Sequence, residues 1–93
     1  MSKSKLLISE MAISDLELHW KQALTTGSIK EADELYTHLI SQLRKIANNF
    51  TIGKSIENTR DGYRVLQMEE YHIYYRADLV NTVEVIRILN LNS

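Results

Sequence analysis

Apolar residues recur with two different periods along this chain, and the change of period predicts its elements. Through the first half they return at the spacing of amphipathic helices. In the last third they form short runs rich in β-branched and aromatic residues, bounded by polar clusters, which is typical of strands. A short strand is predicted at residues 3–8, and three more at residues 62–68, 70–77 and 82–89.

Two capped helices follow the first strand. Ser9 is the predicted N-cap of the first helix, and Gly27 its predicted stop, because glycine reaches the left-handed conformation without a Cβ clash. Ser28 and Glu31 have the spacing of a capping box, which opens the second helix. Only Gly27 separates the helices, so we expect an antiparallel hairpin. The second helix carries a broad apolar stripe of Ile29, Ala32, Leu35, Tyr36, Leu39, Ile40, Leu43, Ile46, Ala47 and Phe50.

The strands should build one sheet that covers the hairpin. Residues 48–61 are a polar connector, and in the strand after the next turn Tyr71, Ile73 and Tyr75 share one face. The last strand is apolar on both faces, which indicates a central strand or one covered by a partner. Its two faces are Ile86 with Ile88, and Val83, Val85, Arg87 and Leu89. The predicted fold is α+β, in the order β-α-α-β-β-β, with the helical hairpin packed on a small, antiparallel-rich sheet.

The face of the sheet away from the helices is the candidate binding surface. Each of the last three strands carries one arginine, and a guanidinium is not buried without a partner. The alternative is that these arginines form ordinary surface ion pairs with Glu69, Glu84 and Asp78. His19 and His38 stand among polar helical residues and are expected to be solvated. The residues predicted on the open face are Arg64, His72, Tyr74, Arg76 and Arg87, an aromatic and cationic surface suited to an acidic ligand.

Composition narrows the function classes. The 93 residues suit one domain, 1–93, and the formal charge of -1 argues against bulk or sequence-specific nucleic-acid binding through phosphate contacts. Cysteine is absent, and we find no signal-peptide core and no membrane-length apolar run, so a cytoplasmic protein is expected. No metal, cofactor or nucleophile motif is present either. The residues therefore favour a binding module over an enzyme, with no catalytic residue, metal or cofactor assigned.

Several motifs in order resemble a known family. The motifs that carry the resemblance follow the helical hairpin and are Gly53-Lys54, Gly62-Tyr63-Arg64, Tyr74-Tyr75-Arg76 and residues 85–89. In these motifs the chain is similar to the ParE branch of the RelE/ParE toxin superfamily. The resemblance implies a toxin of a type II toxin–antitoxin system that a cognate antitoxin neutralises. ParE toxins are associated with inhibition of DNA gyrase, and RelE toxins with ribosome-dependent cleavage of mRNA. Cleavage needs cations and a group that moves a proton, and in RelE-like enzymes these come partly from basic and Tyr or His residues at and beyond the last strand. Residues 90–93 of this chain are neutral and include no such group, which favours the gyrase-directed branch.

The resemblance also implies where partners bind. We expect target contacts at Arg64, Arg76, Arg87, His72 and Tyr74, and antitoxin contacts on the hairpin at Tyr36, Leu39 and Leu43. Asn90 stands where many ParE proteins carry a histidine before a charged tail, so a non-toxic, antitoxin-binding relative is an open alternative, as is an mRNA endoribonuclease. A homodimer and a toxin–antitoxin hetero-oligomer are both compatible with the sequence.

Overall fold

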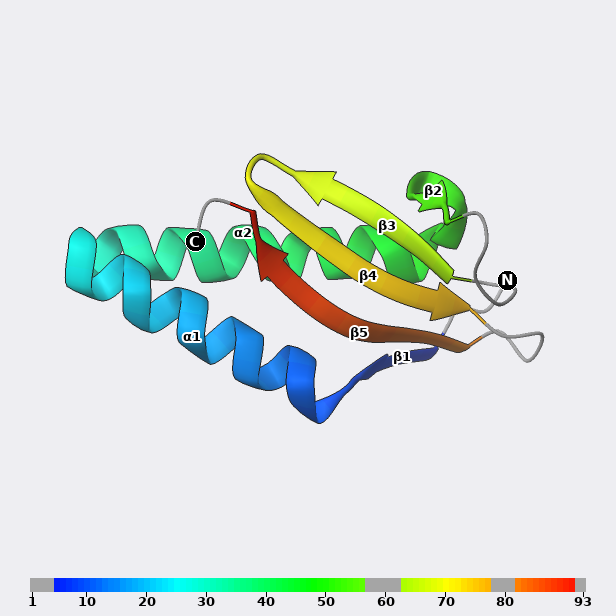
Figure 1. Ribbon diagram of the computed structural model, residues 1–93, viewed down its shortest axis with the longest axis horizontal. Helices are drawn as coiled ribbons and strands as arrows, with labels where there is room; N and C mark the ends of the chain where they lie inside the picture. The colour runs from blue at the N-terminus through cyan, green and yellow to red at the C-terminus, as the bar shows by residue number, and fades with distance from the viewer. Residues whose placement is uncertain (1–4, 57–62, 78–81, 92–93) are drawn as a thin grey trace.

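A helical hairpin lies against one face of a five-stranded sheet in the computed structural model, which describes residues 5–56, 63–77 and 82–91 (Figure 1). The predicted order of helices and long strands is confirmed, and one short strand, β2, is additional. The elements are β1 (Lys5–Ile8), α1 (Glu10–Thr26), α2 (Ile29–Asn48), the 3-10 helix η1 (Phe50–Ile52), β2 (Lys54–Ser55), β3 (Tyr63–Met68), β4 (Tyr71–Ala77) and β5 (Thr82–Asn90).

The caps of both helices are as predicted, except at Gly27. The Ser9 hydroxyl accepts a hydrogen bond from the Ala12 N–H at 3.0 Å, and the Ser28 hydroxyl accepts one from the Glu31 N–H at 3.2 Å. Gly27 has φ -136° and ψ -114°, so the predicted left-handed stop is wrong. An added Cβ would lie 2.8 Å from the end of the exposed Glu31 side chain, which can move aside, so space alone does not require glycine here.

The strand order is β1-β5-β4-β3-β2, with β1 parallel to β5 and every other pair antiparallel. The central position predicted for the last strand is therefore confirmed. The polar connector is less irregular than expected, because it contains η1 and β2, which extend the sheet beyond β3. Some predicted features lie outside the described residues. They are the start of the first predicted strand (residues 3–4), part of the connector together with Gly62 (residues 57–62) and a predicted turn (residues 78–81).

The core lies between the sheet and the hairpin. In β4 the predicted alternation is confirmed, since Tyr71, Ile73 and Tyr75 are all buried. In β5 the predicted strict alternation is wrong, because the register shifts between Tyr74 and Tyr75 and both Val85 and Ile88 face the core. Among the described residues, no helix is long and apolar enough to cross a membrane.

Candidate functional site

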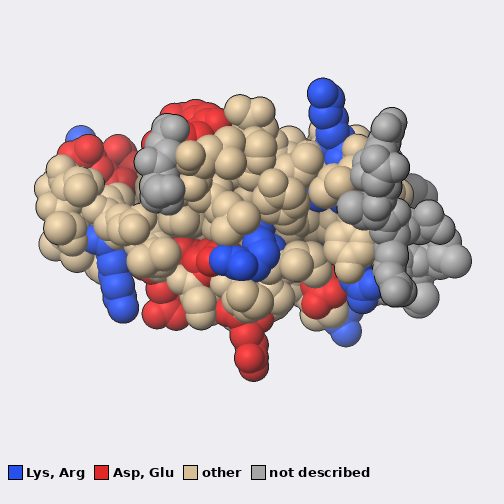
Figure 2. Space-filling model, viewed as in Figure 1, with Lys and Arg blue, Asp and Glu red and all other residues tan. Residues whose placement is uncertain are grey.

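The surface of the sheet that faces away from α2, here called the open face, is the candidate site. Residues directly opposite each other in a sheet share a face, so the register defines its members. From this side the molecule is mostly uncharged, with cationic and acidic atoms in contact near the middle (Figure 2). The open-face residues of the three long strands are Tyr63, Val65, Gln67, His72, Tyr74, Arg76, Glu84, Arg87 and Leu89.

Arg64 does not lie on this face, so the prediction that it does is wrong. It stands opposite Tyr75 and shares its covered side of the sheet. Its Nη1 donates a hydrogen bond to the Gly53 carbonyl at 2.8 Å, and its guanidinium lies 5.7 Å from the centre of the Phe50 ring. Arg64 therefore links β3 to residues 50–53, the segment that follows α2.

The Tyr75 hydroxyl completes this attachment. It donates to the Phe50 carbonyl at 2.5 Å and accepts from the Gly53 N–H at 2.9 Å. A Cβ at Gly53 would lie 2.5 Å from the hydroxyl oxygen, so glycine is required for the close approach. Burial raises the pKa of Tyr75, which outweighs the opposing effects of the Gly53 hydrogen bond and of Arg64, and the hydroxyl stays protonated at neutral pH.

Tyr75→Phe should lower the free energy of unfolding by about 1–3 kcal/mol, because it leaves the Gly53 N–H and the Phe50 carbonyl without their buried partner. Urea titration followed by circular dichroism would measure the change. Tyr74→Phe is the matched control, since the Tyr74 hydroxyl lies 3.4 Å from His72 Nδ1 on the open face. The control should change stability by less than about 0.5 kcal/mol. Equal losses in both variants would contradict the role given to the Tyr75 hydroxyl.

The two arginines that do lie on the open face are both paired with carboxylates. Arg76 Nε lies 3.1 Å from Glu84 Oε1, in a partly exposed pair directly across β4 and β5. Arg87 Nε and Nη2 donate to the two oxygens of Asp15 at 2.8 and 3.1 Å. The cross-strand ion pair with Glu84 is one of the alternatives that the sequence left open. The Asp15 pair joins the sheet to α1 and was not foreseen.

Asp15 is the most constrained ionisable group near the open face. Its side chain is 10% exposed, whereas that of Arg87 is 35% exposed. It also accepts the Ile88 N–H at 2.9 Å. Burial raises the pKa of Asp15. The hydrogen bonds from Arg87 and Ile88, together with the nearby positive charge, lower it by more than burial raises it, so the net shift is downward. The hydrogen bond to Asp15 in turn raises the pKa of Arg87, so the pair is charged at neutral pH.

Asp15 is one of three side chains, from α1 and its N-cap, that form hydrogen bonds with the backbone of β5 where β1 no longer pairs with it. β1 pairs with β5 only as far as Val85, and beyond it the edge of β5 faces α1. The Ser9 hydroxyl donates to the Ile86 carbonyl at 2.8 Å, and His19 Nε2 lies 2.7 Å from the Ile88 carbonyl. Because these groups satisfy an edge that would otherwise be unpaired, α1 is held in a fixed position beside the open face.

His19 is therefore buried, and the expectation that it is solvated is wrong. Only 4% of the residue is exposed, and its ring packs edge-on against Tyr71 with 4.9 Å between the ring centres. His38 is largely exposed as expected, with its Nδ1 3.8 Å from Glu69 Oε1. His72 and Tyr74 lie side by side on the open face, where their ring centres are 6.0 Å apart. The open face thus brings together His72, Tyr74, Arg76 and Arg87, four of its five predicted residues.

The residues predicted to bind an antitoxin lie in two different environments. Leu39 and Leu43 are each only 1% exposed and pack in the core, so their assignment as surface contacts is wrong. Tyr36 is 44% exposed. It lines a groove of about 420 Å³ between the helices, together with Glu17, Trp20, Lys21 and Asp33.

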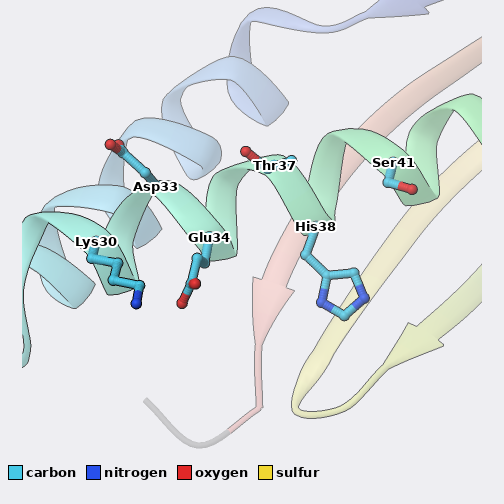
Figure 3. Close-up of a pocket in the computed structure, with 6 residues that line it drawn as sticks. All are labelled: Lys30, Asp33, Glu34, Thr37, His38 and Ser41. Atoms are coloured by element: carbon cyan, nitrogen blue, oxygen red, sulfur yellow. The ribbon is translucent and has the colours of Figure 1, made fainter.

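A second, more polar groove of about 570 Å³ runs along α2. Figure 3 shows Lys30, Glu34 and His38 projecting from one side of the helix and Asp33 pointing toward α1. Asp33 lines both grooves and accepts a hydrogen bond from Trp20 Nε1 at 3.0 Å. The exposed part of the hairpin is thus an aromatic groove bordered by charged side chains.

Two solved structures share this fold. The chain superposes on a structure described as a chromosomal ParDE toxin–antitoxin system from P. aeruginosa, with a TM-score of 0.80, 16% identity, and 95% of this chain and 96% of that chain covered. It also superposes on the toxin–antitoxin complex RelBE2 from Mycobacterium tuberculosis, with a TM-score of 0.68, 17% identity, and 97% and 93% of the two chains covered. The fold is that of the RelE/ParE toxins.

The sequence places the chain within that class. Residues 6–90 match the family described as the ParE toxin of the type II toxin–antitoxin system parDE. The protein named Toxin ParE1 from Mycobacterium tuberculosis, recorded for strains CDC 1551 / Oshkosh and H37Rv, is 28% identical over 87 residues, which cover 94% of this chain and 89% of the relative. This chain belongs to the ParE toxin family of type II toxin–antitoxin systems.

Proposed function

We propose that this chain inhibits DNA gyrase in the cytoplasm by protein–protein contact through the open face, and that a cognate antitoxin neutralises it. Membership of the ParE toxin family carries the proposal. The open face supports it, because it combines half-buried apolar and aromatic residues with the guanidinium groups of Arg76 and Arg87. Such a surface suits a protein partner, whose contacts are typically aromatic and arginine-rich at their centre.

The direct test is supercoiling of relaxed plasmid by purified gyrase with increasing amounts of the purified chain. Supercoiling should fall as the chain is added and recover when the antitoxin is supplied in equal amount. Heat-denatured chain controls for non-specific inhibition. Full supercoiling at a large molar excess of folded chain would reject gyrase as the target.

A second candidate function is ribosome-dependent mRNA cleavage, which one observation favours. His72 and Tyr74 lie 3.4 Å apart through Nδ1 and Oη, and Tyr74 stands directly opposite Arg87. A proton-transfer group beside a cation is the minimum that phosphodiester cleavage requires. Primer extension on translated messages would show cuts in register with codons, and their absence would leave the gyrase proposal or a non-toxic relative.

For the antitoxin we propose the groove between α1 and α2, with Tyr36 as its exposed aromatic contact, in a toxin–antitoxin hetero-oligomer. Trp20 lies in the same groove, and its indole is oriented by the hydrogen bond to Asp33. Aromatic side chains lining a groove between helices suit the apolar face of an amphipathic segment. Leu39 and Leu43 are core residues and are not part of this surface.

A further inference from the structure

We propose that the Arg87 guanidinium is a preorganised binding site for a carboxylate side chain of the toxin's protein target, and that Asp15 is the residue that positions it. The inference rests on the proposed function in one respect, that the open face contacts the target. It adds the edge of the guanidinium that makes the contact, the chemistry of its ligand and a residue of α1 that was not among the predicted target contacts.

The geometry of the pair leaves one edge of the guanidinium available. Nε and Nη2 are the donors to Asp15, at 2.8 and 3.1 Å. Nη1 and the outer hydrogen of Nη2 have no acceptor among the residues that the structure describes. This outer edge presents parallel N–H groups, the arrangement that binds a carboxylate through both of its oxygens.

The guanidinium is held with little freedom to move. The Asp15 carboxylate is fixed from a second direction by the Ile88 N–H at 2.9 Å, which belongs to the strand that carries Arg87. The helix that carries Asp15 is in turn attached to the same strand edge by Ser9 and His19. A ligand therefore meets an arginine whose side-chain entropy is already lost, which lowers the cost of binding.

Pairing also determines what kind of ligand the site prefers. Asp15 offsets the positive charge of Arg87, so attraction at long range is weak and recognition depends on hydrogen-bond geometry. A polyanion such as RNA gains most from unpaired cations, and the net charge of this chain is -1. A single carboxylate presented by a protein surface, beside Tyr74 and Leu89 of the open face, fits the site better.

Two substitutions separate this role from a purely structural one. Asp15→Asn keeps the shape of the side chain but removes the charge and one of the acceptors that hold Arg87. Arg87→Lys keeps the positive charge but removes the planar guanidinium, so it cannot bind Asp15 and a second carboxylate through two parallel N–H groups each. Ser9→Ala is the control for a loosened α1, because it removes the N-cap of that helix and its hydrogen bond to the Ile86 carbonyl but leaves the hydrogen bonds between Arg87 and Asp15 in place.

Growth arrest after induction of each variant, corrected for the folded fraction in cell extracts, gives the first readout. Asp15→Asn and Arg87→Lys should each weaken toxicity by about tenfold or more, the loss expected for one charge-assisted hydrogen-bonded contact. Ser9→Ala should retain toxicity per folded molecule. Full toxicity of folded Asp15→Asn would overturn the proposal, and so would an equal loss in Ser9→Ala.

A second readout does not depend on the target. In NMR spectra of the purified chain, the side-chain N–H resonances of Arg87 should shift when sodium acetate replaces sodium chloride at constant ionic strength. The shift should be lost in Asp15→Asn and kept in Ser9→Ala. An unresponsive Arg87 in the wild-type chain would overturn the proposed site even if gyrase is inhibited.

The two proposals can fail separately. If gyrase is unaffected but growth arrest and the acetate shift both depend on Asp15 and Arg87, the target is another protein and the site stands. If primer extension shows codon-positioned cuts that both substitutions abolish, the ligand of Arg87 is a phosphate, and the assignment to a protein carboxylate is overturned.

Discussion

Leu39→Asp should unfold the protein. Leu39 is 1% exposed and packs among the core residues of α2 and the sheet. The substitution removes its apolar contacts and forces a carboxylate into a cluster of buried apolar side chains, a combined cost of about 5 kcal/mol or more. A domain of this size has a total stability of about 5–15 kcal/mol, so most of the margin is lost. Circular dichroism and the dispersion of the NMR spectrum would report the loss of folded protein.

Tyr36→Asp is the matched control, one helical turn before Leu39 on the exposed side of α2. Because Tyr36 is 44% exposed, its substitution should change the free energy of unfolding by less than about 1 kcal/mol. It should nevertheless weaken binding of the antitoxin by about tenfold or more, if the groove between the helices is the binding site. Unchanged antitoxin affinity in the folded variant would reject that location, and a folded Leu39→Asp would contradict the packing.

Local signals were enough to predict most of the fold. The serines at positions 9 and 28 act as the predicted caps, and the short connection of Gly27 and Ser28 between the helices forces the hairpin. The alternation in β4 correctly separates Tyr71, Ile73 and Tyr75 from the open face. These features depend on residues that are neighbours in the sequence, so they can be predicted from capping residues and from the spacing of apolar positions. The short β2 and the bulge at Ile86 of β5 depend on which strands pair, and no local pattern contains that information.

The errors in the predicted site have the same origin. Arg64 and Tyr75 share a face because of the register between β3 and β4. The sequence around Arg64 does not determine this register. Similarly, a stripe that includes Leu39, Leu43 and Tyr36 identifies the apolar side of α2, but not which of its members the sheet covers. Side-chain assignment to core or surface needs the position of the neighbouring element.

The contact between α1 and β5 was the largest omission. Asp15 and His19 lie on a helix among other polar residues, and their spacing of four residues places them on one side of it. That spacing was the available signal, since two polar residues on the buried side of an amphipathic helix require partners. The partners, Arg87 and the backbone of Ile88, are more than 60 residues away in sequence. Only the position of α1 along the edge of β5 reveals them.

Asp15→Asn should lower the free energy of unfolding at pH 7 by about 3 kcal/mol. This value is the lower end of the range for breaking a buried ion pair, because the Arg87 side chain is 35% exposed and regains some hydration. The remaining amide oxygen can accept only part of what the carboxylate accepts from Arg87 and from the Ile88 N–H. Urea titrations of the two proteins give the difference directly.

Acid should remove this difference, and the sign follows from the pKa of Asp15. The pKa in the folded protein lies below the ordinary value near 3.8, so the folded state favours the ionised carboxylate. Its contribution to stability is fully present above the pKa of the unfolded chain, about 3.9, and is lost as the pH falls through the lower folded value. The other carboxylates titrate in both proteins and cancel in the comparison. The wild-type chain should therefore keep its advantage over Asp15→Asn from neutral pH to about pH 5 and lose it progressively below pH 4. If the difference in the free energy of unfolding stays constant until both proteins unfold in acid, the charge of Asp15 does not contribute to stability.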